Sequence, residues 1–425
     1  MDKKIITSDI IGESYLKISH ASGLSIYLYP KEGFASTYAM FSTNYGSIDT
    51  SFKISTDNEI HKVPAGIAHF LEHKLFESED GDAFSRYAKT GASANAFTSF
   101  DTTSYLFSTT DNFYEALEIL LDFVQSPYFT KETVDKEQGI IAQEIKMYDD
   151  DPNWRVLFNL LRAMYKNHTV KEDIAGTVES ISQITPEYLY DCYKTFYNLN
   201  NMSLTVVGNF NTEKVLEMCD KMLKPSQNVT IERYFEEEPN EVVTNYIEES
   251  LPVASTLFNL GYKENIKGVK TAKDVAITEI LLDILASTSS DLYKKLFDMR
   301  LVNDASFSYE YFEGDGFSAV IFGGESKNPK QVKEEINKYI AKLKLVGINE
   351  EDFQRTKKAI YGSNVSGLNK IPTIAHAISS LSFKNRELFE FIASFAQISL
   401  EDVQNRLNEL FCEEYSVLSV ISTGE

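Results

Sequence analysis

The hydrophobic pattern of the chain describes the same succession of elements twice. Thr185 and Pro186 have the types expected for the cap and the first residue of an amphipathic helix, and the β-branched run at 204–208 predicts a buried strand after it. Near the C-terminus, Ser399 caps a similar helix and residues 418–421 predict the strand that follows. Helix and strand recur at one constant offset, because positions 184 and 204 correspond to positions 398 and 418 without a gap. The pattern therefore indicates an internal repeat.

A second pair of helices supports this interpretation. One begins near position 129 and the other near position 348, at a slightly larger offset, and a change of loop length explains the difference. Amphipathic helices also resemble each other by chance, but a capped helix, a turn and a strand recur here together. We expect strands at Ser203–Gly208, Ala254–Tyr262, Ser306–Tyr311 and Phe317–Gly323.

These elements predict an α+β protein of two homologous domains, each a mostly antiparallel sheet with helices packed on it. The N-terminal domain is expected at 1–224 and the C-terminal domain at 246–425. The linker between them, 225–245, has turn-forming residues and an acidic run but lacks strong periodicity.

Composition narrows the range of functions. The 425 residues carry a formal net charge of −22, which argues against nucleic acid as a partner, because phosphate binding needs a basic surface. The charge is compatible with basic peptide substrates, but an ordinary acidic, soluble surface is the favoured explanation. No apolar run is long enough for a membrane span or a signal peptide. The three cysteines are widely spaced, so we expect reduced thiols and a cytoplasmic protein.

The strongest chemical signal is an HxxEH motif formed by His69, Glu72 and His73. The segment has helical periodicity, and Pro64 suits its first turn. Histidines four residues apart project from one face of a helix and can bind one metal ion. Glu72 lies beside this face, where it can reach a water molecule as a general base without being a ligand. Two unconnected histidines on a surface helix are the weaker alternative, because the chain has only six histidines.

A catalytic zinc ion needs a third protein ligand, and the helix expected from Thr130 to about Tyr148 offers two candidates. Glu137 and Glu144 are seven residues apart and share one face of that helix. A solvated face that contacts no metal explains two glutamates equally well, so spacing alone leaves this choice open. The apolar stripe of the helix is expected to consist of Val134, Ile141 and Ile145.

Four segments resemble the pitrilysin/insulinase family of zinc metallopeptidases, the inverzincins, and the short two-domain bacterial members of YmfH-like type in particular. They are Gly66–His73, Gly91–Thr98, Glu137–Ile145 and Ala175–Ile181. The resemblance implies that Glu144 is the third zinc ligand. It also implies that Glu137 belongs to the catalytic machinery as a group that orients a ligand.

The resemblance further implies how a peptide substrate is bound. Family members add the peptide as a strand to a sheet edge, which would lie here at Asn95 and Ala96, and an ordinary loop-to-strand turn is the less favoured alternative for this segment. Many also hold substrate with an arginine and a tyrosine seven residues apart. Arg300 keeps that spacing to Phe307, which lacks the hydroxyl, and Phe297 is the other position that can be aligned with the arginine.

The implied activity is that of a zinc endopeptidase in which Glu72 takes a proton from water and returns it to the leaving amine. The second half lacks an HxxEH motif, so it is expected to be non-catalytic, and His376 there is expected to be a packed or surface residue. Because family members enclose substrate between four such domains, this chain is expected to form a homodimer or a heterodimer with a paralogue. The alternatives are a non-proteolytic assembly subunit and a metal-dependent hydrolase of other substrates.

Overall fold

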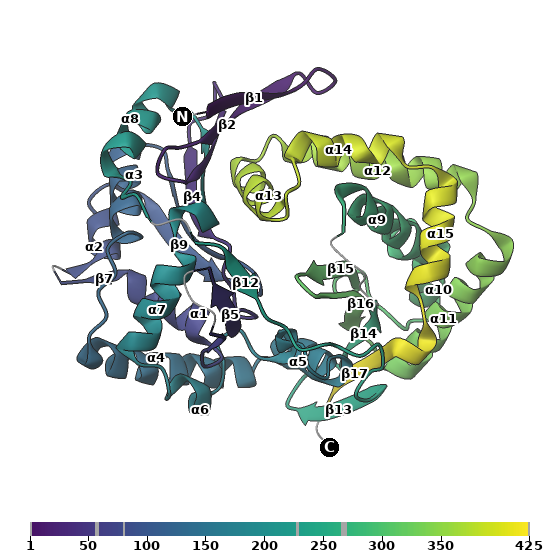
Figure 1. Ribbon diagram of the computed structural model, residues 1–425. Coiled ribbons are helices and arrows are strands. Elements are labelled where there is room, and N and C mark those ends of the chain that lie inside the picture. The colour runs from purple at the N-terminus through teal and green to yellow at the C-terminus, as the bar shows by residue number, and fades with distance from the viewer. Residues whose placement is uncertain (1, 56–58, 80, 227–228, 265–269, 424–425) are drawn as a thin grey trace. The chain divides into compact units, whose positions relative to one another are not determined.

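The computed structural model describes residues 2–55, 59–79, 81–226, 229–264 and 270–423 (Figure 1). The chain forms two compact units, each of which combines a sheet with helices, so the predicted α+β class with two related domains is confirmed. Unit 1 consists of Met1–Ile145, Asp173–Tyr234 and Val365–Phe389, and unit 2 consists of Lys146–Glu172, Phe235–Asn364 and Glu390–Glu425. The predicted boundaries at residues 224 and 246 divide the chain by its repeat and stay a prediction.

Unit 1 is built on a mixed sheet of seven strands, counted over the described residues, in the order β1-β2-β3-β11-β4-β10-β9. Only β11 and β3 are parallel, and the other neighbours are antiparallel. The strands are β1 Asp2–Ser8, β2 Glu13–Ser19, β3 Ser25–Pro30, β4 Thr37–Thr43, β9 Ser93–Thr98, β10 Thr103–Thr109 and β11 Met202–Gly208. Within the residues described, β9 pairs only with β10, so it forms an edge of this sheet.

Helices and short strands complete the first half of the chain. The helices are α1 Ile67–Leu75, α2 Ala83–Tyr87, α3 Phe113–Phe123, α4 Lys131–Asp149, α5 Pro152–Met164, η1 Thr169–Lys171, α6 Val178–Ile181, α7 Pro186–Phe196, η2 Leu199–Asn201 and α8 Thr212–Met222. The short strands are β5 Ser51–Ile54, β6 His61–Lys62, β7 Glu77–Ser78, β8 Gly81–Asp82 and β12 Ile231–Arg233. The strand β12 lies within the predicted linker and pairs with β5.

Unit 2 is built on a sheet that has five strands among the residues described, in the order β13-β17-β14-β16-β15. Again one neighbouring pair, β13 and β17, is parallel. The strands are β13 Tyr246–Leu251, β14 Leu257–Lys263, β15 Ser308–Gly314, β16 Phe317–Glu325 and β17 Ser416–Thr423. The helices are α9 Ala272–Ala286, α10 Asp291–Asp298, α11 Pro329–Val346, α12 Glu350–Gly367, α13 Ile371–Phe383, α14 Leu388–Gln397, α15 Leu400–Leu410 and η3 Glu413–Tyr415.

The internal repeat is visible in the element boundaries. The distance along the chain from the start of α7 to the start of α15 is the same as that from the start of β11 to the start of β17, as predicted. The starts of α4 and α5 are likewise related to those of α12 and α13 by one common, slightly larger offset. Thr185 and Ser399 cap their helices with side-chain hydrogen bonds, as predicted.

Each unit also takes one helix from the opposite half of the repeat. The helix α5 packs on β13, β14 and β17 of unit 2, although its sequence precedes that unit's sheet. In the same way, α13 packs on β4 and β11 of unit 1, where Ser379 donates a hydrogen bond of 3.0 Å to Ser42. The two related helices therefore exchange places, and each sheet is completed by a segment remote in sequence.

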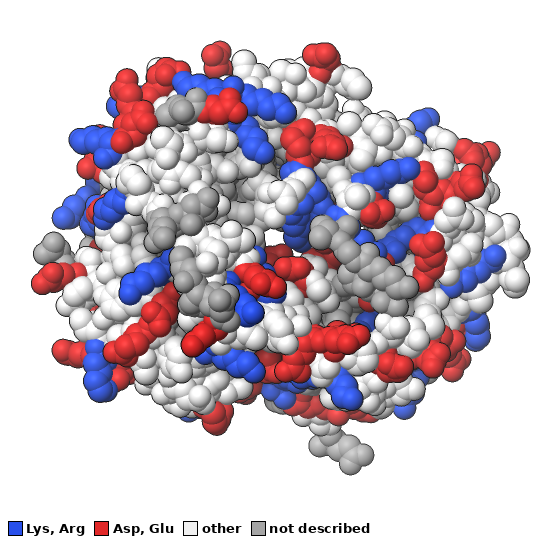
Figure 2. All heavy atoms as spheres, viewed as in Figure 1, with Lys and Arg blue, Asp and Glu red and all other residues white. Residues whose placement is uncertain are grey.

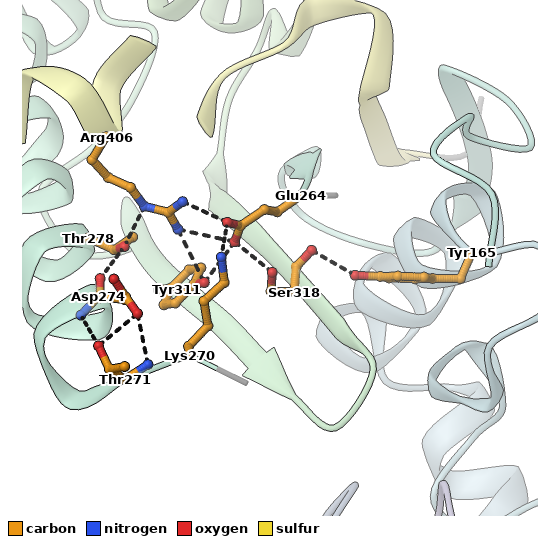
Figure 3. Close-up of polar contacts among 9 residues, drawn as sticks. All are labelled: Tyr165, Glu264, Lys270, Thr271, Asp274, Thr278, Tyr311, Ser318 and Arg406. Atoms are coloured by element: carbon orange, nitrogen blue, oxygen red, sulfur yellow. Dashed lines mark hydrogen bonds and ion pairs between the residues drawn. The ribbon is translucent and has the colours of Figure 1, made fainter. Parts of the chain in front are cut away.

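A buried ion-pair network stabilises unit 2 (Figure 3). Arg406 donates hydrogen bonds of 2.6 and 3.1 Å to the two carboxylate oxygens of Glu264, and Lys270, Tyr311 and Ser318 contact the same group. Burial by itself raises the pKa of Glu264, but these partners, Arg406 above all, outweigh burial and lower it to about 2. The folded unit therefore strongly favours the ionised carboxylate.

We expect Glu264→Gln to lower the free energy of unfolding of unit 2 by about 3–5 kcal/mol at neutral pH, because it leaves Arg406 buried without a counter-charge. The folded pKa of Glu264 is below the ordinary value of 4.5, so its contribution is present above 4.5 and is lost as the pH falls toward about 2. The difference in the free energy of unfolding between the wild type and the variant should therefore become smaller below pH 4.5. Denaturant unfolding at pH 3 and pH 7 measures it, with Glu334→Gln, which affects an exposed pair, as the control. A difference that is the same at both pH values would contradict this prediction.

Candidate metal centre

The helix α1 that carries the HxxEH motif begins at Ile67, three residues after the predicted first-turn proline Pro64. The reason is Gly66, which adopts a left-handed conformation with φ 86° and lies directly against another loop. A Cβ atom at Gly66 would come within 2.4 Å of the carbonyl oxygen of Ala175. The start of the helix is therefore set by a close approach of two loops, which local periodicity does not reveal.

The histidines of α1 are held by a buried helix. Eight of its nine residues are buried, and the helix packs on β9 and β10 and against α7 (Figure 1). His69 and His73 are one turn apart, and their ring centroids are separated by 4.6 Å. His69 is buried and His73 is partly exposed, so the pair lies at the border between the interior of unit 1 and solvent.

Glu144 on α4 completes a cluster with the two histidines. Its carboxylate oxygens lie 3.7 Å from Nε2 of His69 and 3.5 Å from Nε2 of His73. With zinc bonds of about 2.0–2.2 Å, ligand atoms in a tetrahedral site are about 3.3–3.6 Å apart. All three ligand atoms lie within 4.8 Å of one another. Two imidazoles and one carboxylate in this arrangement fit a zinc ion and leave the fourth position for water or substrate.

The ionisation of the two histidines reflects their surroundings. Burial, and then the neighbouring His73, lower the pKa of His69, which favours the neutral imidazole that a metal ion binds. Burial also acts to lower the pKa of His73, but the hydrogen bond to Glu137 and the nearby carboxylates outweigh it and raise the pKa. The buried Nδ1 atom of His69 has no hydrogen-bond partner among the residues described.

Glu137 lies behind the cluster, two turns before Glu144 on α4. One oxygen of Glu137 lies 3.0 Å from Nδ1 of His73, the ring nitrogen that is not directed at Glu144. Such a contact fixes the ring orientation and directs Nε2 toward the candidate metal position between His69, His73 and Glu144. The two glutamates that spacing could not distinguish therefore face different atoms. The predicted buried stripe, which holds α4 in this position, is confirmed as Val134, Ile141 and Ile145.

Glu72 is buried on the same helix, and its carboxylate is held by an edge strand. Thr98, the last residue of β9, donates a hydrogen bond of 2.7 Å to Oε2 of Glu72. Burial raises the pKa of Glu72, and the Thr98 hydrogen bond opposes that change. No helical or motif spacing connects Thr98 with residue 72, so the sequence does not mark Thr98 as a functional residue. The only signal was its place at the end of the segment Gly91–Thr98.

The structure places the predicted substrate-binding residues in two different units. Asn95 and Ala96 lie on the edge strand β9 of unit 1, where Asn95 is exposed and its side chain accepts a hydrogen bond from the Ala96 amide. Arg300 lies after α10 in unit 2, is exposed, and has a φ of 56°. Phe307 packs against the hydrophobic core of unit 2. The roles of Asn95, Ala96 and Arg300 stay predictions.

His376 is a neighbour of the sheet of unit 1. Its Nε2 atom lies 3.0 Å from the hydroxyl of Tyr38 on β4, and its ring stacks on Phe97 of β9 with centroids 5.5 Å apart. It is therefore a packed histidine with an exposed side, on a helix that belongs to the second half of the sequence.

Comparison with known proteins decides the family. Residues 60–178 match the family described as "Insulinase (Peptidase family M16)", and residues 183–360 match "Peptidase M16 inactive domain". The uncharacterized zinc protease YmfH of Bacillus subtilis is 42% identical over 395 residues, which cover 92% of each chain. The chain belongs to the M16 insulinase family.

Solved structures agree with this M16 assignment. An M16-like peptidase from Alicyclobacillus acidocaldarius superimposes with a TM-score of 0.93 at 35% identity and covers 100% of this chain and 99% of its own. Pitrilysin superimposes with a TM-score of 0.76 at 16% identity, which shows a common fold, and this M16 chain covers 46% of its length. The HxxEH motif lies in the segment that matches the peptidase, whereas residues 183–360 match the domain described as inactive.

Two further observations concern membrane spans and surface charge. No helix in the described parts of the chain combines the length and the apolar character that crossing a membrane would need. On the face shown in Figure 2, acidic and basic side chains are mixed, in a chain whose formal net charge is −22.

Proposed function

We propose that this protein is a zinc-dependent endopeptidase that hydrolyses peptides or flexible segments of polypeptides. The observation that carries this proposal is the convergence of His69, His73 and Glu144 on one point, with Glu72 on the same helix as the histidines. Relatives that are named as zinc proteases support the same activity.

The chemistry assigned to each side chain follows from its contacts. A zinc ion held by His69, His73 and Glu144 would supply a Lewis acid that acidifies water and polarises the scissile carbonyl group. Glu72 takes the proton of the attacking water and transfers it to the leaving amine, a role that suits a buried carboxylate with a raised pKa. Glu137 orients His73 through Nδ1.

The peptide is proposed to bind along β9. In the part of the chain that the structure describes, this strand has one partner, β10, so its second edge can accept an extended chain through main-chain hydrogen bonds. The amide of Ala96 and the exposed side chain of Asn95 lie on this strand. Recognition of this kind selects an extended backbone and makes few demands on side chains, which favours flexible substrates over folded ones.

We propose that the working enzyme is a dimer. In fold, this chain corresponds to a little less than half of pitrilysin, so two such chains contain a similar number of domains. The second chain is either another copy or a paralogue. Native mass spectrometry of the purified chain, alone and with candidate paralogues, distinguishes these cases, and a monomer under all of these conditions would contradict the dimer.

The proposed activity predicts one zinc ion per chain and cleavage of an unstructured fluorogenic peptide. A chelator is expected to abolish cleavage, and added zinc to restore it, because the three ligands form the metal site in the folded chain. Metal analysis and the peptide assay, performed on the same sample, measure both. Bound zinc without any cleavage would favour an assembly subunit, and cleavage that resists metal removal would overturn the zinc mechanism.

A further inference from the structure

The contact between Thr98 and Glu72 joins the base of the metal centre to the edge strand of the sheet. The Thr98 hydroxyl donates a hydrogen bond of 2.7 Å to Oε2 of Glu72, and the two residues are 26 positions apart. Glu72 belongs to α1, whereas Thr98 ends β9. The hydrogen bond is therefore tertiary and depends on how the strand is placed against the helix.

Strand geometry directs Thr98 toward α1. Successive side chains of a strand point to opposite faces of a sheet, so Phe97 and Thr98 point in opposite directions. The ring of Phe97 stacks on His376 of α13, and the hydroxyl of Thr98 reaches α1. A shift of one residue in the pairing of β9 with β10 would turn Thr98 away from Glu72.

The end of β9 that carries Thr98 is firmly anchored. Two backbone amides, those of Ser47 and Ile48, donate hydrogen bonds of 3.0 Å to the carbonyl oxygens of Ser99 and Phe100, which follow Thr98 directly. At Gly46 the two loops approach so closely that a Cβ atom would lie 2.4 Å from the backbone of Phe100. Thr98 therefore has a fixed position relative to the sheet.

The hydrogen bond from the Thr98 hydroxyl can fix the orientation of the buried Glu72 carboxylate. Glu72 is 8% exposed, so few water molecules can orient it. A hydrogen bond on Oε2 fixes the plane of the carboxylate, and the direction in which its second oxygen can accept a proton follows from that plane. Orientation of this kind changes the rate of the proton transfer more than the affinity for substrate.

We propose that Thr98 is a positioning residue for Glu72, so that the strand that pairs with the peptide also orients the general base. This inference rests on the proposed function. A peptide added to β9 is then aligned with a strand whose last residue holds Glu72, and one rigid element sets both the substrate backbone and the base.

The test is a set of variants of the full chain: Thr98→Val, Thr98→Ser, Glu72→Gln and the double variant T98V/E72Q. Thr98→Val removes the hydroxyl at nearly constant volume, and we expect kcat to fall about 10- to 100-fold, with KM changed less than about twofold and one zinc ion retained. Thr98→Ser keeps the hydroxyl and should retain at least about half of kcat. Because Thr98 acts through Glu72, the double variant should be no more than about twofold slower than E72Q alone.

Thr90→Val is the matched control, since it removes a part-buried threonine hydroxyl just before β9 that donates to the carbonyl oxygen of Tyr87. It should leave kcat unchanged. An unchanged kcat in T98V, a rise in KM alone, loss of zinc, or additive effects of T98V and E72Q would each overturn the positioning role. An inactive wild-type protein would overturn the peptidase proposal and this inference together, whereas an active wild type with an unaffected T98V overturns this inference alone.

Discussion

Glu72→Gln is expected to lower kcat for peptide cleavage by about 10²- to 10⁴-fold, with the zinc content unchanged. Glutamine has the same shape and can still accept the hydrogen bond from Thr98, but its amide cannot take a proton from water. Glu72 does not belong to the group of possible metal ligands, which consists of His69, His73 and Glu144. Steady-state kinetics on an unstructured peptide, combined with metal analysis, measure both quantities.

The control for this variant is Glu132→Gln, which makes the same chemical change at an exposed position in the first turn of α4. It should have wild-type kinetics. A Glu72→Gln protein with undiminished kcat would show that another group is the base. A variant that lost its zinc would instead show that Glu72 contributes to metal binding.

Glu144→Ala is expected to abolish both stable zinc binding and peptide cleavage. Glu144 provides the only carboxylate among the three possible ligand atoms, and its removal leaves two imidazoles, which are too few for a catalytic zinc site. Zinc affinity, measured by competition with a chromophoric chelator, should fall by more than about 100-fold. The Glu144→Ala protein is expected to fold normally, because the side chain of Glu144 is partly exposed.

Glu137→Gln provides the comparison on the same helix. It changes the partner of His73 Nδ1 and leaves the three ligand atoms in place, so the expected loss of zinc affinity is about 10- to 100-fold. The decisive result is that Glu144→Ala loses more zinc affinity than Glu137→Gln. An equal or larger loss in Glu137→Gln would mean that the ligand and the orienting group have been exchanged.

Local physical chemistry made several features predictable from the sequence. The spacing of His69 and His73 places both rings on one face of any helix, whatever surrounds it, and Thr185 and Ser399 cap their helices through bonds to residues three positions away. The repeat was readable because each copy keeps its own caps and hydrophobic period. These signals connect residues within a few helical turns of one another, so they can be recognised from the sequence alone.

Strand ends are less predictable from the sequence than helix caps. The strand predicted at Ala254–Tyr262 is β14, Leu257–Lys263, and the strand predicted at Ser306–Tyr311 is β15, Ser308–Gly314. Pairing with a neighbouring strand decides where a strand begins and ends, and β-branched or aromatic residues continue past those points.

Only the tertiary structure decided which atoms meet at the candidate metal centre. Glu137 and Glu144 share one face of α4. Glu137 lies at Nδ1 of His73 and Glu144 lies near the Nε2 atoms of both histidines, which depends on where the fold places α4 relative to α1. The start of α1 at Ile67, the contact of Thr98 with Glu72 and the exchange of α5 and α13 have the same origin. Each depends on a close approach between segments far apart in the chain, and the spacing of residues carries no record of such approaches.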